Sequence, residues 1–299
     1  MRVSYHEAYY VPLPEKHPFP MGKYPALYHY LLSENLIKTG NVVRPNEAEL
    51  QDLILVHTAE YVHGVIQGTL SSAAIRILGM PWSSGLVRRS LLACQGTINA
   101  ALMALHDGWA ANLAGGTHHA FPEHGEGYCV FNDVAIAIRV LQQAKWIRRA
   151  LVVDLDVHQG NGTAYIFRND PTVFTFSMHG EKNYPFHKQT SDLDVALPDG
   201  LSDDGYMDCL RRFLPQSIVL AQPDVAFYLA GVDVLAGDRL GRLNLSPWGL
   251  RQREYFVLKA LHAAQIPVCI TLSGGYAASA EETARMHAIC YQEARSIFG

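Results

Sequence analysis

Short apolar runs alternate along this chain with segments of helical periodicity, and this alternation most limits the possible folds. Strand, helix and strand in succession form a βαβ unit, and repeated units build a mostly parallel sheet. The expected strands cover residues 109–114, 149–157, 172–178, 224–230 and 267–272. The expected helices cover residues 88–106, 132–145, 203–221, 248–264 and 279–296, with Asp133 and Ser202 as N-caps. The pattern predicts an α/β fold with a central, mostly parallel sheet.

Length and composition limit the number of domains and the kinds of partner. The 299 residues suffice for one large or two small domains, and no linker-like shift in composition divides them. A formal net charge of −4 provides no basic face for a nucleic acid. The five cysteines are scattered without a C-x-x-C pair, which indicates a reducing compartment. Without a signal peptide or a run long enough to span a membrane, we expect a cytoplasmic protein.

Polar motifs stand where each expected strand ends. They read GGTHHA, DVHQGNG, SMHG, AGVD and SGGY in chain order. The carboxyl ends of parallel strands meet at one edge of the sheet, where the loops that leave them form a crevice. We therefore expect these residues, which are distant in sequence, to form one site.

Two of these motifs contain candidate metal ligands. Asp154, Asp156 and His158 stand at alternate positions, so continued strand geometry would point all three side chains to one face. Asp156, His158 and Asp233 form a set of two carboxylates and one imidazole, and three protein ligands are typical of catalytic zinc. The simpler interpretation of each acid is a helix cap or an arginine partner. The matching position of Asp233 at another strand end favours the metal.

The remaining candidates are acid–base and oxyanion groups. His118 and His119 lie in a glycine-rich loop and are candidates for a general base and its acid or electrostatic partner, with Asp154 and Asn161 to orient them. Tyr276 follows two glycines, where its phenol could donate to an oxyanion, although a core tyrosine is an equal alternative. No G-x-S-x-G elbow or P-loop is present, which leaves an activated water as the nucleophile.

The motifs GGTHHA, GYCVFND, DLDVHQGNG, AGVD and GGY, in this order, resemble those of the zinc-dependent histone deacetylase superfamily. The resemblance extends from HPFPMGKY to the last helix and is closest to the class IV enzymes and their bacterial histone deacetylase-like amidohydrolase relatives. It implies an arginase-like three-layer α/β fold and a single catalytic domain over residues 1–299. The implied activity is removal of an acetyl or longer acyl group from N-acyl-lysine in proteins or peptides.

The resemblance also implies a role for each matching residue. One Zn²⁺ would be held by Asp156, His158 and Asp233, His119 would be the general base beside His118, and Tyr276 would polarise the acyl oxygen. The implied substrate-binding residues are Gly127, Tyr128, Tyr184 and Leu240. A structural K⁺ or Na⁺ is implied near Asp154, Asp156, His158, Ser177 and Met178.

The chain departs from many relatives at two positions, and several alternatives stay open. Gln159 stands where a second histidine is common, and Asn161 where an aspartate is common. A neutral Asn161 can orient His119 but cannot stabilise its imidazolium as an anion would, so His119 should be less basic. The alternatives are an acetylpolyamine or other small-molecule amidohydrolase, a ureohydrolase with two manganese ions, and a non-enzymatic acyl-lysine reader. Class IV-like motifs favour tolerance of long acyl chains.

Overall fold

In the computed structural model, which describes residues 2–299, the strands form one eight-stranded sheet with every pair parallel. The strand order is β2-β1-β3-β8-β7-β4-β5-β6. The strands are β1 (Val3–Ser4), β2 (Val42–Val43), β3 (Trp109–Asn112), β4 (Ala150–Asp154), β5 (Val173–Gly180), β6 (Leu193–Leu197), β7 (Val225–Leu229) and β8 (Val268–Thr271). All five expected strands are present, and the parallel sheet confirms the predicted fold class.

The sequence pattern did not reveal β1, β2 and β6, which lie toward the two edges of the sheet. β1 and β2 have only two residues each, too few to show a period. β4 is also shorter than expected, since it ends at Asp154 rather than at residue 157. Asp156 and His158 therefore lie in the bend that follows, and strand alternation is the wrong reason for their meeting.

The helices are α1 (Lys23–Ser33), α2 (Leu50–Leu53), α3 (Ala59–Gln67), α4 (Ser72–Leu78), α5 (Ser84–Asp107), α6 (Asp133–Gln143), α7 (Asn161–Phe167), α8 (Asp203–Ala221), α9 (Pro247–Ala263) and α10 (Ala280–Phe298), with 3₁₀ turns at Glu7–Tyr9 and Thr39–Asn41. The five expected helices are α5, α6, α8, α9 and α10, which begin and end close to the expected boundaries, whereas α1 to α4 and α7 were not expected. The N-cap of α6 is Asn132 and not Asp133, because the Asn132 side chain accepts from the amide of Ala135. Ser202 is in the N-cap position of α8 but makes no side-chain cap bond.

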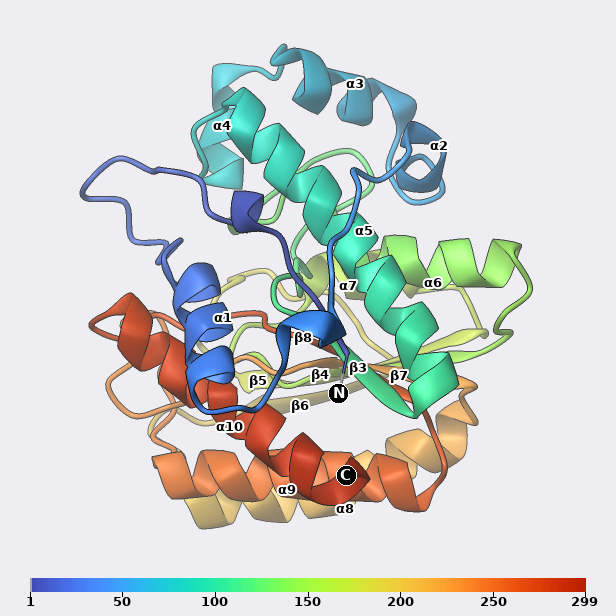
Figure 1. Cartoon of the computed structure of the whole chain (residues 1–299), viewed down its shortest axis with the longest axis vertical. Helices are drawn as coiled ribbons and strands as arrows, with labels where there is room; N and C mark the ends of the chain where they lie inside the picture. The colour runs from blue at the N-terminus through green and yellow to red at the C-terminus, as the bar shows by residue number, and fades with distance from the viewer. Residues whose placement is uncertain (1) are drawn as a thin grey trace.

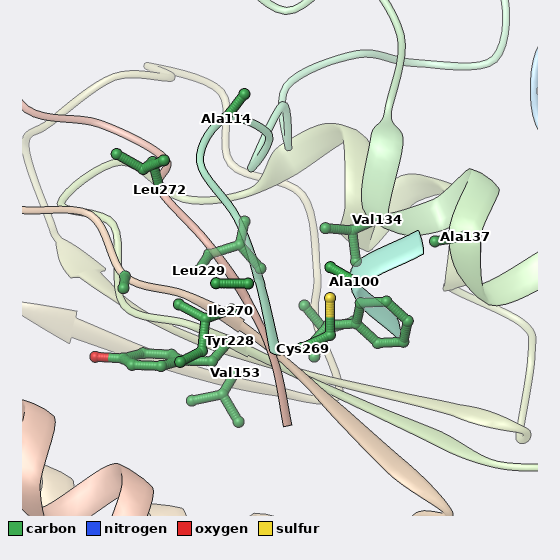
Figure 2. Packing of buried hydrophobic residues seen from close by; sticks show 14 of the residues in the cluster. Ala100, Ala114, Val134, Ala137, Val153, Tyr228, Leu229, Cys269, Ile270 and Leu272 are labelled. Atoms are coloured by element: carbon green, nitrogen blue, oxygen red, sulfur yellow. The ribbon is translucent and has the colours of Figure 1, made fainter. Parts of the chain in front are cut away.

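The helices cover the sheet in layers. Figure 1 shows α8, α9 and α10 along one side of the sheet and α5 with α6 along the other, while α2 to α4 form a separate group beside α5. The central strands β4, β7 and β8 are buried along their whole length. Figure 2 shows Val153, Tyr228 and Ile270 lying next to one another, as their parallel register requires. Burial of a side chain such as Val153 or Ile270 stabilises the fold by about 1.5–3 kcal/mol.

The strand order explains where the site forms. The five strands followed by polar motifs, β3, β8, β7, β4 and β5, are consecutive neighbours in the sheet. Because they are parallel, their carboxyl ends lie at one edge, and their loops converge there. Within residues 2–299, no helix is both long and apolar enough to cross a membrane.

Candidate functional site

The predicted metal ligands come together at the carboxyl edge of the sheet. One donor atom from each of Asp156, His158 and Asp233 lies within 4.8 Å of the others, and all three residues are buried. Nδ1 of His158 lies 2.9 Å from Oδ1 of Asp156 and 3.2 Å from Oδ2 of Asp233. Within residues 2–299, this is the one cluster of His, Cys, Asp and Glu side chains with metal-ligand spacing. Two carboxylates and one imidazole suit a catalytic zinc, which leaves a position for water.

Hydrogen bonds around the cluster occupy both oxygens of Asp156 but only one oxygen of Asp233. Oδ2 of Asp156 accepts from the Ser273 hydroxyl and the Gly274 amide, each at 2.6 Å. Oδ1 of Asp233 accepts from the amide of Val157 at 2.9 Å, whereas its buried Oδ2 has no hydrogen-bond partner in the described chain. A side chain at Gly274 would collide with both carboxylates. An unpartnered carboxylate oxygen in a buried acidic pair fits the binding of a divalent ion.

The histidine pair lies beside this cluster, and each ring has a different partner. Nδ1 of His118 is 2.7 Å from Oδ2 of Asp154, and Nδ1 of His119 is 2.7 Å from Oδ1 of Asn161. Burial lowers the pKa of His118, but Asp154 and Asp156 raise it by more, to about 9. Burial and the neighbouring His118 and His158 hold the pKa of His119 well below its usual value. His119 is thus the neutral ring, able to accept a proton.

The loop that carries the histidines is held by Asp133, a residue that its position in the sequence predicts only as a helix cap. Its fully buried carboxylate accepts from the amides of Gly116 and Thr117 at 3.1 and 2.8 Å, and from the hydroxyls of Thr97 and Thr117. Because Asp133 begins α6, this helix fixes the backbone just before His118. Asp133 is the last residue of the motif GYCVFND, and this motif was the sequence signal that could have pointed to its role.

Tyr276 lies on the loop after β8, with its ring centroid 6.3 Å from that of His158. Oδ2 of Asp238 accepts from the Tyr276 amide at 2.6 Å, which anchors the loop. Lys23 is fully buried beside the tyrosine, where its ammonium donates to the carbonyl of Ser273 at 2.7 Å and lies 5.7 Å from the Tyr276 ring. Burial lowers the pKa of Lys23 to about 8. Only the motif HPFPMGKY hinted at this lysine.

A cavity of about 400 Å³ leads from the surface to His119, His158 and Tyr276. All four expected substrate-binding residues line it, namely Gly127, Tyr128, Tyr184 and Leu240. Gly127 has φ of +55°, and a side chain there would approach the His119 ring to 2.6 Å. The cavity is lined at its outer end by the exposed side chains of Arg76, Lys182 and Arg242.

The expected monovalent-cation residues lie on adjacent strands, since Asp154 of β4 is paired with Ser177 of β5 and Met178 follows. The Ser177 hydroxyl is 2.9 Å from Nδ1 of His179. The monovalent cation stays a prediction.

Comparisons with known proteins agree with this architecture. Residues 17–291 match the family model described as the histone deacetylase domain. An uncharacterized protein of Picosynechococcus sp. is 48% identical over 99% of both chains. Histone deacetylase 2 of Arabidopsis thaliana is 32% identical, covering 87% of this chain and 70% of the relative. The acetoin utilization protein AcuC of Bacillus subtilis is 30% identical, covering 77% of this chain and 65% of AcuC.

Among solved structures, the HD domain of HDA15 superposes with a TM-score of 0.80 at 22% identity, covering all of this chain and 90% of that domain. The fold is therefore the arginase-like deacetylase fold. The family model covers almost the whole chain and includes the metal-ligand triad, the histidine pair and Tyr276. The chain belongs to the histone deacetylase family.

Proposed function

We propose that this protein is a zinc-dependent hydrolase that removes acyl groups from the side-chain amine of N-acyl-lysine in proteins or peptides. Family membership supports a deacetylase activity, and we propose the zinc and the lysine substrate from the residues of the site. The observation that carries it is the meeting of an acid–base histidine, a carboxylate–imidazole triad and a phenol at the inner end of one cavity.

Zn²⁺ held by Asp156, His158 and Asp233 would supply a Lewis acid and lower the pKa of a water. The rest of the chemistry belongs to side chains of this chain. His119 is neutral and takes the proton of the attacking water through Nε2, because its Nδ1 is directed to Asn161. Tyr276 donates its hydroxyl to the oxyanion that develops on the acyl carbon. A histidine then protonates the leaving amine.

The walls of the cavity suit the stem of an acylated lysine. Tyr128 and Tyr184 provide aromatic faces for the four methylene groups, and the Gly127 carbonyl is the acceptor proposed for the substrate amide N–H. The cavity has Arg76, Lys182 and Arg242 at its outer end and no Asp or Glu in its lining, although Arg242 is paired with Asp199 at 3.3 Å. Such a mouth repels the additional ammonium groups of an acetylpolyamine, so a peptide is the preferred substrate.

The space beyond the ligands favours a short acyl group. A void of about 30 Å³ lies among Tyr24, Cys129 and Tyr276, against about 400 Å³ for the cavity that leads to it. This inner void is too small for a long acyl chain, which suits a short acyl group such as acetyl. We therefore propose that acetyl-lysine is the preferred substrate. This differs from the preference for long acyl chains that the class IV-like motifs of the sequence favour.

A substrate panel tests the proposal. Peptides with acetyl-, butyryl-, decanoyl- and myristoyl-lysine are compared with acetylated polyamines on the zinc-loaded protein, and released amine is measured by mass spectrometry. We expect kcat/KM to be highest for the acetyl peptide. Turnover of polyamines alone, or of none of these substrates, would overturn the proposal. The two-manganese alternative predicts two bound metal ions per chain, and the reader alternative predicts binding without turnover.

A further inference from the structure

Glu126, which lies between two glycines of the loop after the histidine pair, has no role in the function proposed above. Its carboxylate is mostly buried, with 14% of the side chain exposed. Oε1 accepts from Nδ2 of Asn161 at 2.5 Å and from the hydroxyl of Tyr184 at 2.8 Å. Oε2 lies 3.5 Å from Nε2 of His124. Three polar groups therefore converge on one acid next to the general base.

The bond to Asn161 determines which way the Asn161 amide faces. An ionised carboxylate only accepts hydrogen bonds, so the amide must present its NH₂ group to Glu126. Its oxygen, Oδ1, must then face Nδ1 of His119, 2.7 Å away. An oxygen at that distance needs a donor, so His119 has its proton on Nδ1 and a free lone pair on Nε2.

Glu126 is ionised in this environment. Burial raises its pKa, but the bonds to His124, Asn161 and Tyr184 outweigh burial and hold the pKa below its usual value. Without the carboxylate, the Asn161 amide could turn over and present its NH₂ group to His119. The imidazole would then carry its proton on Nε2, the nitrogen that has to accept one.

We infer that Glu126 is a positioning residue that orients the Asn161 amide and thereby keeps His119 in the Nδ1–H tautomer required of the general base. The inference deepens the proposed function and rests on it, because His119 is the base proposed there. An aspartate at position 161 would need no such help, since either carboxylate oxygen accepts from Nδ1. Glu126 thus compensates for the neutral side chain of Asn161.

Three variants separate this role from a merely structural one. In Glu126→Ala, we expect kcat to fall at least tenfold, because a general base contributes about 10²–10⁴-fold and most of the molecules would hold His119 in the wrong tautomer. In Asn161→Asp, the two carboxylates would stand 2.5 Å apart and repel, so this variant is also impaired. In the double variant, the carboxylate introduced at position 161 accepts from His119 with no acid beside it, and we expect kcat to return to within about threefold of wild type.

Glu123→Ala is the matched control, because it removes an exposed acid from the same loop, and we expect unchanged kcat. Recovery of kcat in the double variant is the decisive result. Glu126→Ala also removes the hydrogen bond from the Tyr184 hydroxyl, and Asn161→Asp does not restore that bond. A recovery therefore reports on His119 and not on Tyr184. Unchanged kcat in Glu126→Ala, or no recovery in the double variant, would overturn the inference.

A second readout does not depend on turnover. Nitrogen-15 NMR of labelled histidine distinguishes the two tautomers of His119. We expect the Nδ1–H form in wild type and an increased Nε2–H population in Glu126→Ala. If no substrate is hydrolysed but the tautomer shifts in this way, the proposed function fails and the inference about Glu126 stands. The inference is contradicted if His119 of the wild-type protein is in the Nε2–H form, or if Glu126→Ala leaves its tautomer unchanged.

Discussion

Replacing Tyr276 with Phe removes one oxygen atom from the inner end of the cavity and little else. The ring is 7% exposed and packs against Phe19 and Tyr128, contacts that a phenyl ring keeps. Its hydroxyl forms no hydrogen bond within residues 2–299, so no structural bond is lost. Burial, with Asp156 and Asp233, raises the pKa of Tyr276 well above its usual value. The phenol therefore stays protonated and able to donate.

Loss of one oxyanion donor lowers kcat by about 10²–10³-fold, which corresponds to about 2.7–4 kcal/mol of transition-state stabilisation. The free energy of unfolding should change by less than about 1 kcal/mol, because volume and packing are nearly conserved. Activity is measured on an acetyl-lysine peptide, zinc content by mass spectrometry and stability by urea unfolding.

Tyr255→Phe is the control, since Tyr255 is an exposed tyrosine on α9 whose hydroxyl accepts from Lys259. We expect this variant to match wild type in all three measurements. If Tyr276→Phe keeps kcat within about threefold of wild type while zinc stays bound, the hydroxyl has no part in stabilising the oxyanion and the reasoning is refuted.

Three further predictions address the metal, the pH dependence of stability and the substrate. Asp233→Ala should lose both bound zinc and turnover, and full zinc occupancy measured in this variant would remove Asp233 from the ligand set. His57 is buried with a pKa lowered to about 4, so its contribution to stability is complete above pH 6.5 and is lost as pH falls from 6.5 toward 4. At pH 5 the loss is about 2 kcal/mol, and urea unfolding of His57→Gln should show a pH 7 to pH 5 difference smaller by that amount; an unchanged difference contradicts it. Acetyl-lysine peptides with Glu neighbours should exceed those with Lys neighbours by about fivefold in kcat/KM at low salt, and charge reversal of Arg76 and Lys182 should remove this preference. If the wild-type protein hydrolyses the peptides with Glu neighbours and those with Lys neighbours with equal kcat/KM, the basic residues at the cavity mouth do not select the substrate.

Several features of the fold and site were predictable because a short segment of the sequence is enough to specify each of them. The five central strands and the long helices α5, α6, α8, α9 and α10 show their periods within a single segment. Two-residue strands such as β1 show none, and the end of β4 at Asp154 depends on pairing with β5 and β7, where the register also stops. The cytoplasmic location and the monovalent cation stay predictions.

Residue chemistry also predicted that Asp156, His158 and Asp233 form one cluster and that the histidine pair lies beside it, because Asp, His and paired glycines at strand ends are uncommon in a purely structural role. Asp133 shows where this reasoning reaches its limit. An acid at the start of a helix indicates a cap, yet its carboxylate holds the backbone of Gly116 and Thr117, 17 and 16 residues away. The packing of the whole chain decides which backbone amides lie next to the start of a helix, so the sequence around Asp133 could not predict these bonds.

The sequence by itself determined the α/β class, the edge of the sheet at which the candidate site lies and the residue types that form it, because periodicity and side-chain chemistry are local properties. Only the tertiary structure decided that Glu126 reaches Asn161 across 35 positions and that Lys23 reaches Ser273 across 250. It also brought Arg76, Lys182 and Arg242 to one mouth. Those meetings follow from the order in which the strands pair, β3-β8-β7-β4-β5, and strand order is set by the burial of the whole core rather than by any one segment.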